Sequence, residues 1–414
     1  MKTSNISLRI IWQVLVTAAL MALMPLSHAD KIEQARLDAL SGYMKGEVDA
    51  GRLAGIVTLI AKDGDVQQFE AFGHRDLENN LPMEKDSIFR IFSMTKPVVG
   101  TALMTLYDQG KFTLDDPVEK FIPEFKDLQV FTGAGEGGGF KTEPANHPMT
   151  VRELMSHTGG LLYVPPLSRG PLAEAYGKVG VLDRNSTLEE MAAKLGKLPL
   201  GYQPGTQWVY SVSVDVQGYL VEVLSGKKLD VYLQEKIFTP LGMKDTAFYV
   251  APAKASRLSR NYAPGQDGKL ASPPNGEFLE NPKFLSGGGG LTSTAADYLR
   301  FAQMHLNKGE LDGKRIISEK AANLMRVNQL PDAVENIGPF YPGNKFGLDF
   351  AVVYDSEKAD GVSEGSFWWW GIAGTWFWID PVEDIVFIGM IQHGNIGYAR
   401  QLQAKSKQLL YRPL

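Results

Sequence analysis

Ser93 and Lys96, three residues apart, are the side chains in this sequence best suited to nucleophilic chemistry. They follow an apolar segment and open a helical pattern, so both should lie on one face of that helix. A serine hydroxyl attacks a carbonyl only when a base accepts its proton, and a lysine whose pKa is lowered by burial can be that base. Because Ser-x-x-Lys is common by chance, the alternative is a helix start with an unrelated lysine.

Acyl transfer needs two further features, a group that shuttles a proton to the leaving group and two N–H donors for the oxyanion. Tyr210 is a candidate for the shuttle because it lies between Trp208-Val209 and a predicted helix, where a side chain can face a cleft. Beside two cations, its pKa would fall below the usual value of about 10. The alternative is an ordinary half-buried tyrosine.

Three other patterns fit structural roles better than reactive ones. Gly361-Val-Ser-Glu-Gly365 matches the α/β-hydrolase nucleophile motif, but a strand rather than a helix follows it, so we expect a hairpin loop. The six histidines form no His-x-x-x-His pair and there is no cysteine, so we expect no metal site and no cofactor. His157 is expected to bond a loop. Trp368 to Trp370 cannot all face one core, so at least one should line a cleft.

The composition is that of an ordinary globular protein, with 44% of the 414 residues hydrophobic and 21% charged. The formal net charge of -5 and the lack of a basic run argue against a nucleic-acid partner. A chain without cysteine has neither disulfides nor a thiol nucleophile. The sequence carries no signal for a particular oligomeric state.

Residues 1–29 have the pattern of a secretory signal peptide. Lys2 and Arg9 precede a short apolar stretch, and small residues at 27 and 29 precede a cleavage point at Asp30. The alternative is an uncleaved anchor, which is disfavoured because a bilayer span needs about 20 apolar residues. We expect a periplasmic or secreted protein with no stable membrane span after signal removal.

Strands at both ends of the chain predict an α+β fold, with one antiparallel sheet built from the N- and C-terminal segments and an inserted, mainly helical lobe. We expect an α/β lobe over 30–92 plus 286–414 and a helical lobe over 93–285. The expected strands are 55–62, 66–72, 346–353, 366–372, 375–379 and 385–392. Residues 111–149 show no regular pattern, and we expect the glycine-rich run within them to be a surface insertion.

Five motifs together resemble the serine β-lactamase and penicillin-binding-protein-like superfamily: Ser93-Met-Thr-Lys96, Met155-Ser-His-Thr-Gly-Gly-Leu161, Tyr210, Gly287-Gly-Gly-Gly-Leu-Thr-Ser293 and Trp369-Trp-Gly-Ile-Ala-Gly-Thr375. Their order and spacing match over nearly all of 30–414. The chain is most similar to the class C-type branch that includes family VIII carboxylesterases and related acyltransferases. The resemblance implies a β-lactamase/transpeptidase-like fold and one catalytic domain over 30–414.

The resemblance also implies roles for individual residues. Ser93 would be the acylated nucleophile and Lys96 its base, while Tyr210 would relay protons in acylation and deacylation. The backbone N–H of Ile372, with that of Ser93, would form the oxyanion hole.

Two departures from the family pattern concern the substrate. The strand motif, Lys-Thr-Gly in the lactamases, falls on Trp369-Trp370-Gly371, which are the substrate-binding candidates. The missing lysine and threonine would hold the carboxylate of a β-lactam or a D-alanyl peptide. The family's Tyr-x-Asn reads Tyr210-Ser211-Val212, so an amide is missing too. Both changes favour a neutral ester; Arg90 could restore a positive charge if its side chain points into the cleft.

We therefore expect an exported serine hydrolase that cleaves small-molecule carboxylic esters, or amides, through an acyl-enzyme. The alternatives are a β-lactamase or D-Ala-D-Ala-type peptidase, an acyltransferase, and a non-catalytic protein that binds cell-wall fragments.

Overall fold

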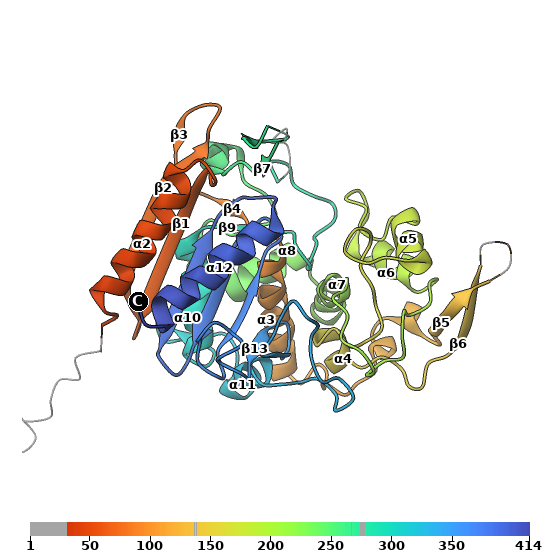
Figure 1. Cartoon of the computed structure of the whole chain (residues 1–414). Helices are drawn as coiled ribbons and strands as arrows, with labels where there is room; N and C mark the ends of the chain where they lie inside the picture. Colours follow the sequence, from red (N-terminus) through yellow and green to blue (C-terminus); the bar gives the residue numbers. More distant parts are fainter. Residues whose placement is uncertain (1–30, 136, 138, 266, 274–277) are drawn as a thin grey trace, which may run out of the picture.

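The structure, a computed structural model, is built around one antiparallel sheet with helices on both faces (Figure 1). It describes residues 31–414 except 136, 138, 266 and 274–277, so the predicted signal peptide lies outside the described residues. The sheet order is β12-β13-β14-β15-β16-β1-β2-β3. The strands are β1 Gly55–Lys62, β2 Asp65–Asp76, β3 Leu81–Pro82, β12 Asn344–Phe346, β13 Ala351–Val353, β14 Phe367–Trp370, β15 Trp376–Asp380 and β16 Ile385–Met390.

The N- and C-terminal segments meet in this sheet where β1 pairs with β16 in antiparallel register, which confirms the predicted fold class. Both strands are apolar and buried along nearly their whole length, as expected for central strands covered on two faces. Cross-strand aromatic pairs add to this core: the Trp378 and Phe387 rings stack at 4.1 Å between β15 and β16.

Helices cover the two faces of the sheet, and adjacent residues of β15 show which helix lies on which face. Phe377 packs against Tyr298 of α10 (Ala295–Leu306), with ring centroids 4.9 Å apart. Trp378 donates a hydrogen bond to the hydroxyl of Tyr411 in α12 (Ile396–Tyr411) at 3.0 Å. Because successive strand residues point to opposite faces, α10 and α12 lie on opposite sides of the sheet. Helix α2 (Gln34–Asp49) packs beside α12 (Figure 1).

The 3-10 turn Phe92–Met94 contacts β14 of the sheet and leads into α3 (Thr95–Asp108), whose neighbour in the helical part is α7 (Ser213–Ser225). Capping boxes open α4 (Val151–Met155) and α6 (Leu188–Leu195). The other helices of the described residues are α5 Pro171–Lys178, α8 Leu229–Leu233, η5 Gln234–Phe238, α9 Thr239–Leu241 and α11 Glu319–Met325. Segments of 3-10 helix lie at Phe92–Met94, Val118–Lys120, Pro123–Phe125 and Pro252–Arg257. Short strands β4 Phe89–Arg90 and β9 Thr292–Ser293 pair with each other, as do β7 Ala263–Pro264 with β8 Leu270–Ala271 and β10 Glu310–Leu311 with β11 Lys314–Arg315.

Two sequence expectations are wrong. Residues 346–353 form not one strand but a hairpin of β12 and β13, with Asp349 at φ 61° in the turn. The apolar pattern runs through this turn because Leu348 and Phe350 are themselves fully buried. Residues 111–149 are not irregular throughout: β5 (Gln129–Ala134) and β6 (Phe140–Pro144) form a hairpin. Its strands are mostly exposed, so they lack the apolar alternation by which a strand is recognised.

Candidate active site

Ser93 and Lys96 meet as their spacing predicts. Ser93 lies in the 3-10 turn Phe92–Met94 and Lys96 in the first turn of α3. The Lys96 ammonium nitrogen is 3.2 Å from the Ser93 hydroxyl oxygen, and the lysine side chain is completely buried. A buried amine at hydrogen-bond distance from a partly exposed hydroxyl has the geometry of a base beside a nucleophile.

Three further groups hold the Lys96 amine in place. It donates to the Gly288 carbonyl oxygen at 2.6 Å and to the Tyr163 hydroxyl at 3.2 Å, and it lies 4.5 Å from the ring centroid of Tyr210. Sequence reasoning missed Tyr163, although it follows the Met155–Leu161 motif by two residues. The amine therefore has a fixed direction toward Ser93.

Tyr210 lies beside Lys96 and Tyr163, in the loop before α7. Its ring packs against those of Tyr163, His157 and Trp369 at 5.4, 5.0 and 5.5 Å. The hydroxyl is buried and makes no hydrogen bond of standard geometry to a described residue. Burial raises the pKa of Tyr210, and its interactions with Ser93 and Trp369 offset only part of the rise, so the expected lowering of this pKa is wrong.

Asp215, which sequence reasoning also missed, anchors the glycine loop that holds Lys96. Its carboxylate accepts hydrogen bonds from the Ser286 hydroxyl at 2.6 Å and the Gly288 N–H at 3.0 Å. A Cβ at Gly288 would lie 2.5 Å from the Asp215 Oδ2 and 2.9 Å from the Tyr163 hydroxyl, so glycine is required there. Burial raises the pKa of Asp215, although Ser286 and the charge of Lys96 oppose the rise. Its position five residues after Tyr210, on α7, was the available signal.

Ser93 opens into a cavity of about 310 Å³ between the sheet and the helical part. No charged side chain is among the described residues that line it, which are Phe92, Ser93, Tyr163, Leu167, Tyr210, Ser286, Gly288, Gly289, Tyr341, Trp369, Trp370, Ile372 and Ile396. The lining of the cavity is therefore neutral and largely aromatic. The Lys96 amine is buried behind the lining residues.

Only some residues of the Trp369–Thr375 motif line this cavity. Trp369, Trp370 and Ile372 line it, so the expectation that at least one tryptophan lines a cleft is confirmed. Gly371 is not among the lining residues: its N–H donates to the Thr375 carbonyl at 2.7 Å inside the turn after β14, and a Cβ there would strike the Ile91 carbonyl. Gly371 therefore shapes the turn that presents Ile372.

Arg90 does not bring a positive charge to the cavity. Its side chain is buried and donates to the Ser259 carbonyl at 2.7 Å, and it is not one of the lining residues. The Arg90 side chain therefore points away from the cavity, a direction that the sequence leaves open.

His157 is buried beside Tyr210, and its Nδ1 lies 3.0 Å from the Ser211 hydroxyl in the loop before α7. Burial, aided by the charge of Lys96, lowers the pKa of His157 well below its usual value, so the ring is neutral. This placement agrees with a structural histidine that bonds a loop.

The Gly361–Gly365 segment lies in the loop between β13 and β14, without the strand-to-helix turn that a nucleophile elbow needs.

Within the described ranges, no group of three or more His, Asp or Glu side chains could hold a metal ion. No helix in that same part of the chain is both long and apolar enough to cross a membrane.

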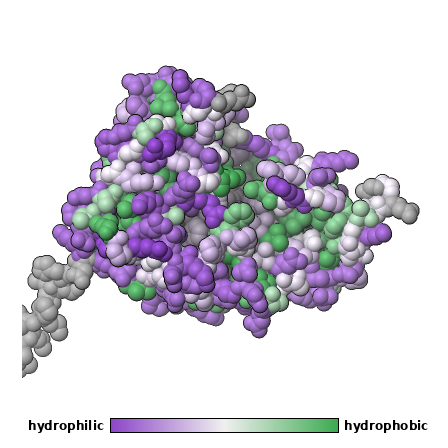
Figure 2. Space-filling model, viewed as in Figure 1, coloured by the Kyte–Doolittle hydropathy of each residue, from purple (hydrophilic) through white to green (hydrophobic). Residues whose placement is uncertain are grey.

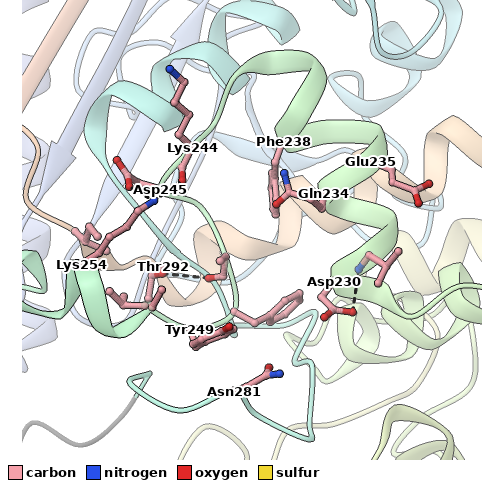
Figure 3. Close-up of a pocket in the computed structure, with 16 residues that line it drawn as sticks. Asp230, Gln234, Glu235, Phe238, Lys244, Asp245, Tyr249, Lys254, Asn281 and Thr292 are labelled. Carbon is pink, nitrogen blue, oxygen red and sulfur yellow. Dashed lines mark hydrogen bonds and ion pairs between the residues drawn. The ribbon is translucent and has the colours of Figure 1, made fainter.

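A larger cavity of about 420 Å³ lies apart from Ser93, between η5 and residues 244–254 (Figure 3). Two of its charged lining residues form an ion pair: the Asp245 carboxylate lies 2.7 Å from the Lys254 amine and also receives hydrogen bonds from Arg257 at 3.0 and 2.9 Å. It contains no nucleophile beside a base among its described lining residues, so size alone does not identify the site of chemistry.

Sequence comparisons find known proteins that are similar to this chain. A family model described as Beta-lactamase matches residues 30–405. The chain is 36% identical over 369 residues to Protein Rv1367c of Mycobacterium tuberculosis, covering 86% of this chain and 90% of that protein. It is 31% identical over 368 residues to Esterase EstB of Burkholderia gladioli, covering 83% and 86%.

Solved structures share the fold. EstCE1, described as a hydrolase with promiscuous acyltransferase activity, superimposes with a TM-score of 0.76 at 27% identity, covering 91% of this chain and 99% of that one. The LovD6 mutant of simvastatin synthase from Aspergillus terreus superimposes with a TM-score of 0.79 at 23% identity, covering 93% and 98%.

Proposed function

Because this chain belongs to the Beta-lactamase family, we propose that it is a serine hydrolase that cleaves carboxylic esters through an acyl-enzyme on Ser93. The observation that carries the proposal is the 3.2 Å contact between the Lys96 amine and the Ser93 hydroxyl at a neutral, aromatic cavity. Similarity to Esterase EstB supports the ester as substrate.

In the proposed reaction, the Lys96 amine accepts the Ser93 proton as the hydroxyl oxygen attacks the ester carbonyl. The bond from the carbonyl carbon to the alkoxy oxygen then breaks, and the proton passes through the Tyr210 hydroxyl to the departing alkoxide. Water enters, loses a proton by the reverse route and releases the acid. The raised pKa of Tyr210 suits this role, because its hydroxyl passes a proton on without remaining ionised.

The oxyanion formed in each step needs donors, and the N–H groups of Ser93 and Ile372 are the proposed pair. Ile372 lines the cavity with Ser93. The turn that carries it is closed by other groups, since Gly371 donates to Thr375 and Gly374 to the Gly371 carbonyl at 2.7 and 2.8 Å.

The β-lactamase and D-Ala-D-Ala-type peptidase alternatives require a group that holds a carboxylate. Trp369 and Trp370 occupy the corresponding strand positions, and no cationic side chain is among the described residues that line the cavity. These substrates are therefore disfavoured relative to neutral esters.

Acyl transfer to an alcohol is a second candidate, favoured by the aromatic lining, on which an apolar alcohol would displace water more readily than on a polar one. The acyltransferase activity named for EstCE1 supports it. An added alcohol would then speed breakdown of the acyl-enzyme beyond hydrolysis alone.

Export to the periplasm or outside the cell is also part of the proposal and rests on the pattern of residues 1–29. Fractionation of cells that express the full chain, with N-terminal sequencing, tests it. The expected mature chain begins at Asp30, and an uncleaved chain in the cytoplasm would contradict it.

The catalytic proposal is tested with p-nitrophenyl acetate and butyrate, nitrocefin and a D-alanyl dipeptide, each with wild type and Ser93→Ala. We expect turnover of the esters, much slower turnover of the other two, and loss of turnover in the variant. A fluorophosphonate should add its mass to wild type only. Full turnover by Ser93→Ala would disprove the mechanism, and a chain that neither turns over nor takes the label is a binding protein.

A further inference from the structure

Three large apolar side chains remain exposed around the mouth of the Ser93 cavity. Leu167, Ile372 and Ile396 are 49%, 37% and 39% exposed, and all three line that cavity. They come from three separate segments: the loop before α5, the turn between β14 and β15, and the first residue of α12. Single exposed apolar residues are normal, but a cluster at the mouth of one cavity indicates a binding surface. We refer to these three residues as the apolar rim.

The backbone that carries the rim is held by hydrogen bonds. Asn395 caps α12 by accepting from the Tyr398 N–H at 3.0 Å, immediately beside Ile396. The hydroxyl of Ser168 accepts from the Tyr163 N–H at 3.0 Å, which ties the Leu167 loop to the catalytic residues. A rim arranged before binding loses little conformational freedom when a ligand covers it.

The surface and interior near the rim define the chemistry of its ligand. Apolar side chains are also visible over the helical part of the face shown in Figure 2, on the side where α5 and α6 lie. Inside the mouth, Trp369 and Trp370 form aromatic walls, and no charged residue is among the described lining residues. The ligand group that covers the rim is therefore neutral and apolar.

We propose that the apolar rim binds the alcohol portion of a neutral ester and makes the enzyme selective for esters of larger apolar alcohols. This rests on the proposed ester hydrolysis. In the first half of that reaction the bond from the carbonyl carbon to the alkoxy oxygen breaks, and the alkoxide takes the proton that came from Ser93. The acyl group stays bound to Ser93, and the alcohol leaves before water enters. Of the two portions of the ester, only the one at the cavity mouth can leave without passing the other. Because the alcohol leaves first, we place the alcohol portion at the mouth.

Two mirrored ester series test this inference. In the first, acetates carry alcohols from ethyl to octyl; in the second, ethyl esters carry acyl groups from acetyl to octanoyl. Because burial of one methylene contributes about 0.8 kcal/mol, wild-type kcat/KM should rise up to about fourfold per methylene in the first series until the rim is covered. The octyl-to-ethyl ratio should reach at least about tenfold.

Leu167→Ser and Ile396→Ser should each lower this ratio at least about threefold, because the methylenes lose their apolar partner. A ratio taken within one variant does not depend on how much of it is folded. Val327→Ser is the matched control: Val327 is 44% exposed and lines neither cavity, so its ratio should equal that of wild type.

Two results would overturn the inference while leaving ester hydrolysis intact. One is an unchanged ratio in both rim variants. The other is a ratio that falls only in the acyl series, which would place the acyl group at the mouth. If no ester in either series is cleaved, or if Ser93→Ala retains turnover, the proposed function itself fails.

Discussion

The Ser93 cavity and the 420 Å³ cavity beside η5 differ in how their polar groups are paired. At the cavity beside η5, the Asp245 carboxylate is paired with both Arg257 and Lys254. Around the Ser93 cavity, buried polar atoms of Tyr210, Trp369 and Asp215 lack a hydrogen-bond partner in the described part of the chain. Each such atom costs about 1–3 kcal/mol, so the catalytic region is not the one arranged for stability.

The backbone shows the same difference. Phe92, directly before Ser93, has φ 41°, and His157 and Asp349 beside the site have φ 57° and 61°. None of the described residues that line the larger cavity has a positive φ. Strain of this kind costs about 1–3 kcal/mol per residue and persists where the surroundings enforce it. Unpaired polar atoms and strained backbone thus mark the reactive region, whereas cavity volume favours the other one.

Removing the base should give the largest effect and is the sharpest test of this contrast. We expect Lys96→Met to lower kcat for p-nitrophenyl acetate about 10⁴-fold, because Ser93 loses its proton acceptor. The matched control is Lys254→Met at the larger cavity, for which kcat should change less than about twofold. Comparable losses in both variants would mean that the two regions do not differ in function.

Tyr210→Phe should follow, with kcat about 10²-fold lower because the proton relay is gone. Removal of an unpaired buried hydroxyl should leave the free energy of unfolding unchanged or raise it by about 1 kcal/mol. Steady-state kinetics and urea unfolding measure the two effects. Tyr249→Phe, at the larger cavity, should alter neither, and a stability loss in Tyr210→Phe without an activity loss would contradict the assigned role.

Gly288→Ala should lower kcat about 10- to 100-fold, because the new methyl pushes the loop away from Asp215 and carries the Gly288 carbonyl away from Lys96. The control is Gly46→Ala in α2, where a Cβ meets nothing within 4 Å. That variant should keep its activity and gain about 0.5–1 kcal/mol of stability. Equal activity in the two variants would show that the Gly288 contact is dispensable.

The smallest effect concerns pH. Burial raises the pKa of Asp349 well above its usual value, so its contribution to stability is fully present below the unfolded pKa of about 3.9 and is lost as pH rises through the folded pKa. Urea unfolding across that window should therefore show wild-type stability falling by at most about 1.4 kcal/mol per pH unit from this group. Asp349→Asn should flatten the slope.

Asp245 supplies the opposite case. Burial acts to raise its pKa, but hydrogen bonds from Arg257 and Lys254 outweigh burial and lower it. Its contribution is present above the unfolded pKa and is lost as pH falls through the folded one. Asp245→Asn should therefore destabilise the protein near neutral pH, with the difference shrinking in acid. A loss of stability in the same pH direction for both aspartates would break the comparison.

Sequence reasoning succeeded where local spacing or motif order carried the information. Ser93 and Lys96 meet at a helix start as their spacing predicts, and the order of the five motifs indicates the fold. It failed at the turn around Asp349, where buried apolar residues made a turn look like a continuous strand. It also failed at the β5–β6 hairpin, where exposed strands lack the apolar alternation that identifies a strand. It missed Tyr163 and Asp215 because their roles depend on contacts with residues far away in the chain.

The sequence by itself determined that Ser93 and Lys96 are neighbours, since side chains three residues apart at a helix start lie on one face. It also determined the loss of the strand lysine and threonine, because Trp369 and Trp370 stand at those positions. Only the tertiary structure decided that Arg90 points away from the cavity, that burial raises the pKa of Tyr210, and that Leu167 and Ile396 line the same cavity. Direction, burial and long-range contact arise only when separate segments pack together, so they are properties of the folded chain.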